Sequence, residues 1–508
     1  MTSMMAGKES PLTKLGNLSR KLGRSSGHSQ PSWIEVEDGL EELKIWALEK
    51  QNRNALLENN FLQAKDVIMA CKDRLCVNTV TEDEKDKQDL ILCLKTLTGT
   101  FRFLRNCCAE VPKNQSWAIS SGAAKQGMEV ILILLRPVFL ENKNGTEIAA
   151  AVQSGLQLLG NAVVKNVATQ ELMWNCCFPQ FFLDVLSSTD QSIQDCLCMI
   201  IFNCLNQQRR LELTKHRSGL KIISHIIHLC ANKSPLEWGY FILDTLICEG
   251  LFPDMYHGIE SDPLARVILL DLFHLKITDA LDESSEKSKG PEMAPEFYAS
   301  SVNYLSHQFE KHVVGITQRL QQLDHSSDDF FQVLIVTRLL SLLSTSTGLH
   351  SSITALQERK SLLETCVGLL KETSTPEAKV TFSNVGSIPQ DVTSERLAPS
   401  QGFQRDLVRV IGNMCYRHRP NQDTVRELDG ISLLLDHCNV DDQNPYICQW
   451  AIFAIRNILE NNKANQDIVA SIDRLGLADT SRLRQFGVDA VELDGGRIKL
   501  MPIKGTLY

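Results

Sequence analysis

An asparagine followed nine residues later by a glutamine recurs along this chain, each time at the end of an apolar run. The clearest copies, "VIGNMCYRHRPNQDTV" and "AIRNILENNKANQDIV", are 44 residues apart. A period of about 40–47 residues is typical of armadillo and HEAT arrays, in which each unit buries its apolar face against the next. The copies begin at Asn106, Asn161, Asn413 and Asn457, with a degenerate fifth at Asn203.

The residues around the last copies indicate helices. Trp450, Ala454 and Ile458 fall four residues apart, so they share one helix face that we expect to be buried. Gly430 is placed to end a short helix, and Asn465 to cap the start of another. Glycine (28) and proline (16) are too sparse for a β-sandwich or barrel of this length. We therefore predict an all-α fold, an armadillo/HEAT-like α-solenoid with a flexible internal loop and a small C-terminal hairpin.

The order of short helix, glycine turn, middle helix, loop and long helix closely resembles an armadillo repeat, whose third helix carries an asparagine facing a concave groove. An amide can donate and accept at once, and so can pair with the backbone of an extended peptide. The alternative is that each amide bonds a neighbouring helix end and stiffens the stack. The candidate groove residues for binding are Asn106, Asn161, Asn413, Asn457, Arg409 and Arg456.

One position departs from the armadillo import receptors. Those receptors carry a ligand-stacking Trp four residues before the Asn, where this chain has Arg102, Gln157, Arg409 and Phe453. The missing Trp argues against an import receptor. A transport adaptor or exchange-factor-like α-solenoid stays open as the alternative to a scaffold.

Changes in composition divide the chain. The start is basic and Ser-rich, which predicts a disordered leader, with a mitochondrial transit peptide as the alternative. Two polar stretches interrupt the helical pattern, and alternating residues near the end predict a hairpin within 491–505. The predicted parts are a leader at 1–32, N-terminal armadillo-like repeats at 33–370 with an exposed loop at 281–296, a flexible linker at 371–402 and a C-terminal armadillo-like domain at 403–508.

The charge balance and the cysteines limit the functional classes. Lys and Arg number 52 against 61 Asp and Glu, a net charge of −9 that repels nucleic acid, and we expect no nucleic-acid partner. The sixteen cysteines lie mostly in apolar helical patterns such as "CLCMIIFNCL", which favours reduced core residues over disulfides. No apolar run reaches the ~20 residues of a membrane span, so no membrane insertion is expected.

No set of residues in the sequence forms a recognisable catalytic motif. His225, His228 and Cys230 could begin a metal site, but no second ligand pair follows at metal spacing. Cys107, Cys177 and Cys415 could each be nucleophiles, yet core packing explains them better. We expect no cofactor, no metal site and no enzyme activity, with an enzyme hidden in a helical fold as the rival class.

The C-terminal segment goes beyond the generic repeat. It contains "IGNMCY", "NQDTVRELDGI", "NVDDQNPYICQWAI" and "NQDIVA" within 403–473, and closely resembles the C-terminal domain of the ataxin-10 family. The family pattern continues with "GLADTSRLRQFGV" to residue 488, and "SGLQLLGNAV" and "VILLDLFHLKIT" resemble its more divergent N-terminal part.

The resemblance implies a non-enzymatic scaffold for protein–protein interaction. Members of the family are linked to cytokinesis, to neuron survival and to neurite outgrowth through Ras–MAP kinase signalling. They are cytoplasmic and perinuclear, at the centrosome and midbody. The implied partners are a G-protein β subunit, the O-GlcNAc transferase and mitotic kinases, with a homo-oligomer also open.

Overall fold

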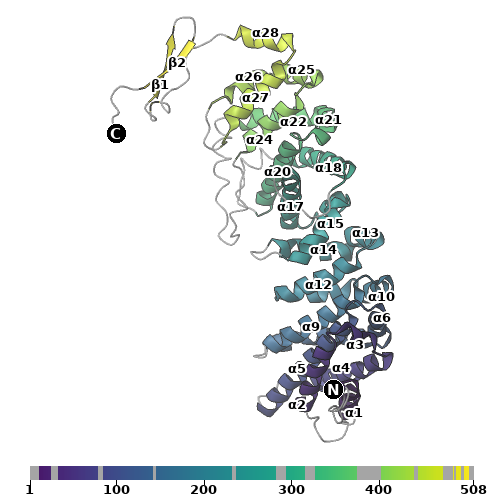
Figure 1. Ribbon diagram of the computed structural model, residues 1–508. Coiled ribbons are helices and arrows are strands. Elements are labelled where there is room, and N and C mark those ends of the chain that lie inside the picture. The colour runs from purple at the N-terminus through teal and green to yellow at the C-terminus, as the bar shows by residue number, and fades with distance from the viewer. Residues whose placement is uncertain are drawn as a thin grey trace. The chain divides into compact units, whose positions relative to one another are not determined.

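A computed structural model describes most of the chain as α-helices (Figure 1). The described residues are 11–23, 33–77, 84–140, 145–231, 236–281, 293–314, 327–374, 402–439, 444–472, 484, 488–493 and 497–502. They form two compact units, which divide between Ser352 and Ile353. This division falls earlier than the predicted linker at 371–402.

Unit 1 is a stack of helices. Its helices are α1 (Pro11–Gly23), α2 (Trp33–Trp46), α3 (Lys50–Asn54), α4 (Glu58–Val77), α5 (Glu84–Cys108), α6 (Pro112–Ser120), α7 (Ala123–Leu134), α8 (Pro137–Leu140), α9 (Gly145–Val163), α10 (Val167–Cys177), α11 (Gln180–Leu186), α12 (Gln191–Cys204), α13 (Gln207–Lys215), α14 (Arg217–Cys230), α15 (Glu237–Cys248), α16 (Phe252–Gly258), α17 (Pro263–Leu281), α18 (Pro295–Val313) and α20 (Ser327–Ser346).

The helices of unit 1 pack in rows, each contacting the next of its kind. The first row is α2, α5, α9, α12 and α15, and the second is α4, α7, α11, α14 and α17. Figure 1 shows α9, α12 and α14 as successive layers of this stack. Apolar side chains such as Phe101, Leu104 and Leu159 are fully buried between the layers. Repeated helices that bury one face against their neighbours confirm the predicted all-α solenoid class.

Unit 2 contains the last two copies of the motif. Its elements are α22 (Lys360–Thr373), α24 (Phe403–Met414), α25 (Arg419–Glu427), α26 (Gly430–Asp436), α27 (Ile447–Leu459), α28 (Lys463–Ser471), β1 (Val488–Leu493) and β2 (Arg497–Pro502), and α21 (His350–Gln357) crosses the unit boundary. Helix α24 packs between α22 and α27. The strands pair antiparallel from Val488 opposite Pro502 to Leu493 opposite Arg497, which confirms the small hairpin.

The prediction of a disordered leader is wrong for part of its length. Residues 11–23 form helix α1, which packs on α2 and α4 and buries Leu15 completely. Ser19 also donates a hydrogen bond to Asp66 at 3.2 Å. Leucines recur every three or four residues in this segment, so an apolar helix face is present despite the basic composition. The rest of the leader lies outside the described residues.

The two predicted loops fall largely outside the described residues as well. Helix α17 runs to Leu281 and α18 begins at Pro295. The first and the last residues of the predicted loop at 281–296 therefore belong to helices. Helix α22 extends to Thr373, into the segment predicted as a linker. The flexibility predicted for these stretches stays a prediction.

The cysteines were predicted to be reduced core residues. Cys107, Cys198 and Cys415 are fully buried, and burial raises the pKa of the neighbouring Cys108 thiol to about 12. The predicted role of these cysteines in core packing is confirmed.

Trp450 was expected in the core beside Ala454 and Ile458, which are both fully buried, yet its own ring is only half-buried. That half of the prediction is wrong.

Candidate functional site

Each long helix that carries a motif copy ends in the same turn. The residue four positions after the motif Asn has a left-handed backbone with φ between 50° and 59°, although none of these residues is glycine. The next residue caps the short helix that follows. Asn166, for example, accepts a bond from the Thr169 N–H, and Asn462 from the Asn465 N–H. The left-handed residues are Glu110, Lys165, Arg417 and Asn461.

The motif asparagines donate hydrogen bonds to the preceding repeat. Asn161 Nδ2 donates to the carbonyl of Arg105 at 3.0 Å, and Asn457 Nδ2 to that of Gly412 at 2.9 Å. Both carbonyls belong to the residue just before the previous copy's Asn. The amide thus joins the motif-bearing helices of successive repeats, α9 to α5 and α27 to α24, which is the structural role weighed against peptide binding.

The remaining asparagines extend this pattern or break it. Asn106 donates to the carbonyl of Lys44 on α2 at 3.2 Å, and Asn413 is buried on α24. Asn203 instead donates to Met199 within its own helix α12. The degenerate fifth copy therefore does not share the bond between repeats.

The second half of the motif closes the helix end. The residue eight positions after the motif Asn donates to the carbonyl of the residue directly after that Asn, at 2.7–3.0 Å in all four copies. These carbonyls are in the last turn of a helix, where the intrahelical pattern leaves them without partners. The donors are Asn114, Thr169, Asn421 and Asn465.

The glutamine of the motif reaches forward to the next repeat. Gln115 Nε2 donates to the carbonyls of Asn161 and Val164 at 3.0 and 3.1 Å. Gln422 does the same for Asn457 and Glu460 at 2.9 and 3.3 Å. Gln170 and Gln466 instead donate to Val163 and Leu459 at the end of the preceding helix. All four copies therefore close a helix end, and the glutamines of two of them also bond the next repeat.

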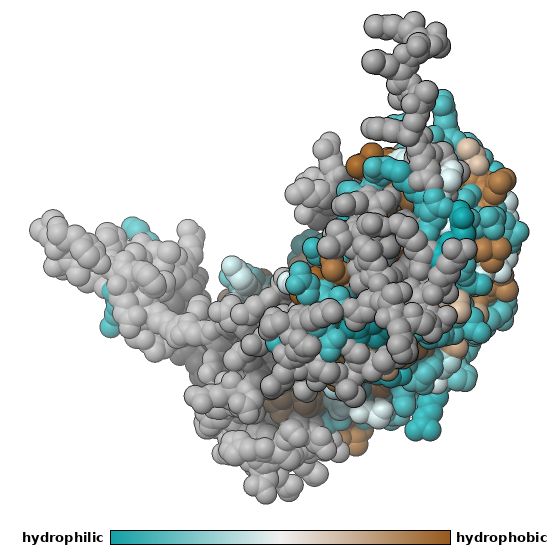
Figure 2. Space-filling view, turned by 90° about the horizontal axis from the view of Figure 1, so that it is seen from below, coloured by the Kyte–Doolittle hydropathy of each residue, from teal (hydrophilic) through white to brown (hydrophobic). Residues whose placement is uncertain are grey.

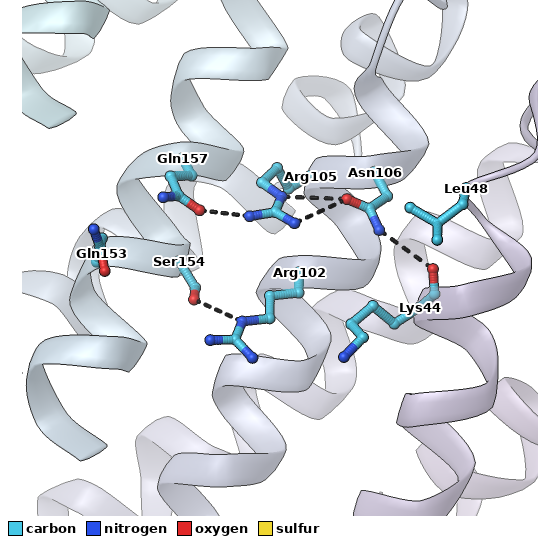
Figure 3. Close-up of a pocket in the computed structure, with 8 residues that line it drawn as sticks. All are labelled: Lys44, Leu48, Arg102, Arg105, Asn106, Gln153, Ser154 and Gln157. Carbon is cyan, nitrogen blue, oxygen red and sulfur yellow. Dashed lines mark hydrogen bonds between the residues drawn. The ribbon is translucent and has the colours of Figure 1, made fainter. Parts of the chain in front are cut away.

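A polar pocket lies beside these bonds, between three first-row helices of unit 1 (Figure 3). Its volume is about 320 Å³. Helix α2 contributes Lys44 and the turn after it Leu48, α5 contributes Arg102, Arg105 and Asn106, and α9 contributes Gln153, Ser154 and Gln157. Leu48 is the one apolar side chain in this lining, so the pocket favours charged and hydrogen-bonding ligand groups.

Neutral partners hold the two arginines of the pocket in place. Arg105 donates from Nη1 to Gln157 Oε1 at 2.6 Å, and from Nε and Nη2 to Asn106 Oδ1 at 3.2 and 3.1 Å. Arg102 Nε donates to Ser154 Oγ at 3.4 Å. Burial, and then the positive charge of Arg102, lower the pKa of Arg105. The pocket therefore concentrates positive charge in a chain whose net charge is −9.

A second cavity of about 230 Å³ adjoins the pocket and shares Lys44 and Arg102 with it. Lys95 adds a further positive charge to its lining, and Glu41 and Glu147 add negative ones. Lys44 pairs with Glu41 at 2.6 Å on α2. The pocket lined by both arginines therefore has no carboxylate in its lining, whereas the adjoining cavity has two.

The predicted groove residues are divided between the two units. Asn106 lines the pocket in unit 1, and Asn161 lies behind it in the bond to α5. The other four belong to unit 2. There the Arg409 guanidinium lies 4.7 Å from the centre of the Trp450 ring, and Arg456 is exposed. Peptide binding by these residues stays a prediction.

The sequence does contain a signal for the pocket. It is the position four residues before the motif Asn, which was interpreted only as evidence that the import-receptor Trp is missing. Arg102 and Gln157 occupy the position four residues before the motif Asn, and both line the pocket. Lys44 had no such signal, because helix α2 contains no copy of the motif.

The histidines considered as metal ligands have other partners. His228 Nε2 is 2.8 Å from Asp262 Oδ2, and His225 Nδ1 is 2.9 Å from the carbonyl of Lys221. Within the described ranges, no three potential ligand side chains converge on one point. No helix in the described part of the chain combines the length and apolar character needed to cross a membrane. On the face shown in Figure 2, hydrophobic residues form small groups among hydrophilic ones.

Comparisons with known proteins agree over most of the length. A family model described as "Spinocerebellar ataxia type 10 protein domain" matches residues 403–501. Ataxin-10 of Xenopus tropicalis is 34% identical over 401 residues, 78% of each chain. Ataxin-10 of Bos taurus is 32% identical over 488 residues, 95% of this chain and 98% of that protein. Ataxin-10 of Homo sapiens is 31% identical over 487 residues, with the same coverage.

Proposed function

The chain belongs to the ataxin-10 family, and we propose that it is a non-enzymatic helical-repeat scaffold that binds an extended segment of a partner protein across α2, α5 and α9. The family resemblance inferred from the C-terminal motifs is thereby confirmed, and the relation covers 95% of the chain. The binding role is our inference from the site.

The observation that carries the proposal is the polar pocket on the first row. Pockets for small molecules and cofactors are lined mainly by apolar and aromatic side chains. This one is lined by two arginines, a lysine, a serine and three amides, beside a single leucine. Such a lining suits the polar side chains and backbone of a peptide.

The rigidity of the first row supports the same role. The Asn106 side chain joins α5 to α2 by donating to a backbone carbonyl of α2, and the Asn161 side chain joins α9 to α5 in the same way. A face held in this way keeps its side chains in fixed positions before a ligand arrives, which lowers the entropy cost of binding. The amides used for that purpose are no longer free to pair with a peptide backbone, so we assign recognition to the residues around them.

We extend the proposal to the cellular setting implied by the family. It comprises cytokinesis, neuron survival and neurite outgrowth through Ras–MAP kinase signalling, at perinuclear, centrosomal and midbody sites. The proposed partners are a G-protein β subunit, the O-GlcNAc transferase and mitotic kinases. Family membership supports these roles. A transport adaptor remains the second candidate, since it would use the same kind of face.

Site-specific photocrosslinking tests the binding face. We would place p-benzoylphenylalanine at Gln153, in the pocket on α9, and in a separate variant at Lys125, an exposed residue of the second-row helix α7. Both full-length variants would be irradiated in cell lysate after their melting temperatures are shown to match. We expect the adduct of a defined partner from Gln153 and not from Lys125. Equal adducts from both positions, or adducts from Lys125 alone, would refute binding across α2, α5 and α9.

A further inference from the structure

We propose that the pocket between α2, α5 and α9 binds an anionic side chain, a carboxylate or a phosphorylated residue, carried by the partner segment. The inference rests on the proposed function and specifies its ligand. It assigns Arg102 and Arg105 as the residues that contact the anion.

The first argument is the contrast between these two arginines and others in unit 1. Among the described residues, neither Arg102 nor Arg105 has a carboxylate within 4.0 Å. Six other arginines of the same unit do, at nitrogen–oxygen distances of 2.5 to 4.0 Å. These pairs are Arg53–Glu110, Arg74–Asp86, Arg209–Glu171, Arg210–Glu249, Arg266–Glu260 and Arg338–Asp271. The pocket thus has two guanidinium groups whose anionic partner is not supplied from within the described chain.

The second argument is the position of the free donors. A guanidinium has five N–H groups and pairs with carboxylate or phosphate through two parallel bonds. Arg102 uses only its Nε among the described residues, in the bond to Ser154, so both terminal nitrogens are available. Arg105 is held by Gln157 and Asn106, which fixes its plane beside Arg102 (Figure 3). An anion entering the pocket would find these donors already oriented.

The third argument is electrostatic. Two like charges held close together in a half-buried pocket repel each other, and each loses part of its hydration. An anion between them attracts both charges and offsets the repulsion and the lost hydration with charge-assisted hydrogen bonds. The adjoining cavity, which Arg102 also lines, contains the carboxylates of Glu41 and Glu147, and Glu41 is already paired with Lys44. Among the described residues, neither carboxylate forms an ion pair with Arg102 or Arg105.

The overall charge of the chain requires that any binding of acidic peptides occur at a local cationic site. With a net charge of −9 the protein as a whole repels acidic peptides. Any preference for an acidic peptide must then arise at a specific cationic site, and binding through it must weaken as salt screens the charges.

Fluorescence anisotropy with the full-length protein tests the proposal. The probes are four labelled peptides of equal length: one with central glutamates, one with central phosphoserines, one with glutamines in place of the glutamates, and one with lysines. The test variant is Arg102→Gln/Arg105→Gln. The control is Lys125→Gln/Lys221→Gln, which removes the same charge from exposed positions on α7 and α14. Thermal melting of each variant shows that it folds.

We expect the glutamate or phosphoserine peptide to bind and the glutamine and lysine peptides not to bind. The arginine variant should weaken that binding about tenfold or more, as expected for the loss of charge-assisted hydrogen bonds. The lysine control should change it less than about twofold, the size of a screened surface effect. The ratio of the glutamate to the phosphoserine dissociation constant identifies which anion is preferred.

Two results would overturn the inference. One is binding of the glutamine peptide as tight as that of the acidic ones, and the other is equal weakening in the arginine and lysine variants. Either result leaves the photocrosslinking at Gln153 untouched, because that experiment does not depend on the ligand's charge. A position-specific adduct without an acidic preference would keep the scaffold and reject the anion site, whereas acidic binding that depends on the two arginines without such an adduct would keep the anion site and reject the lysate partner.

Discussion

Replacing Gln422 by alanine should loosen the end of unit 2, because this side chain joins two successive repeats. Gln422 is almost fully buried on α25. Its Nε2 lies 2.9 Å from the carbonyl of Asn457 and 3.3 Å from those of Cys415 and Glu460. Its Oε1 accepts a bond from Asn462 at 3.2 Å. The substitution removes all of these contacts together.

The expected size follows from these bonds. One amide nitrogen has two hydrogens, so the three carbonyl contacts amount to two full bonds, and the bond from Asn462 is the third. At a net value of about 1 kcal/mol each, the loss is about 3 kcal/mol. The better helix propensity of alanine returns only about 0.4 kcal/mol. A net loss between about 2 and 3 kcal/mol remains, which corresponds to a factor of about 100 in a local opening equilibrium.

Hydrogen–deuterium exchange of the full-length protein measures this local opening, which a whole-chain melt of two units would average. Gln466 provides the control, because it has the same place in the last motif copy but is exposed and bonds only to Leu459. We expect amides in α27 and α28 to exchange about 100-fold faster in Gln422→Ala and about twofold faster at most in Gln466→Ala. Equal factors in the two variants would show that the bridge between repeats does not stabilise this unit.

A second pair of variants tests packing. A Cβ at Gly412 would lie 2.8 Å from a side chain of α27, whereas one at Gly368 on α22 meets nothing within 4 Å. Gly412→Ala should therefore lower the melting temperature of unit 2, and Gly368→Ala should stabilise the unit by about 0.5–1 kcal/mol. A lower melting temperature in both variants would contradict the packing of α24 on α27. A third prediction concerns pH: burial raises the pKa of Asp262, but hydrogen bonds from Ser224, a backbone N–H and His228 outweigh it, so the pKa is lowered overall. The stabilisation is therefore present above the unfolded pKa of about 3.9 and is lost as pH falls through the folded value, so melting temperatures of wild type and Asp262→Asn should differ at neutral pH and converge in acid.

The fold was largely predictable because one motif marks both the helix ends and the repeat length. The motif gives no information about segments outside its copies. Helix α1 was missed because a basic composition outweighed its leucine spacing, although Leu15 is fully buried. Trp450 was placed in the core by its spacing from Ala454 and Ile458, but spacing defines a face and not its edges. The Trp450 ring lies at the edge, under Arg409.

The pocket could not be predicted in the same way, because it depends on which helices become neighbours. Lys44 on α2 and Gln157 on α9 are separated by more than a hundred residues, and α5 brings them to one place. The sequence did show that Arg102 and Gln157 share a motif position. It did not show that α2 would add a third wall or that neither arginine would pair with a carboxylate among the described residues.

The motif itself explains where recognition should be sought. Its asparagines and glutamines close helix ends, and Asn161, Asn457 and Gln422 also bond a neighbouring repeat, a role that does not vary with the ligand. The position four residues before the motif Asn has no such duty. It is Arg102 in one copy, Gln157 in the next, and Arg409 and then Phe453 in unit 2. A scaffold built from identical joints can distinguish partners only through the side chains that differ between them, which is why we place the binding specificity at this position rather than at the repeated amides.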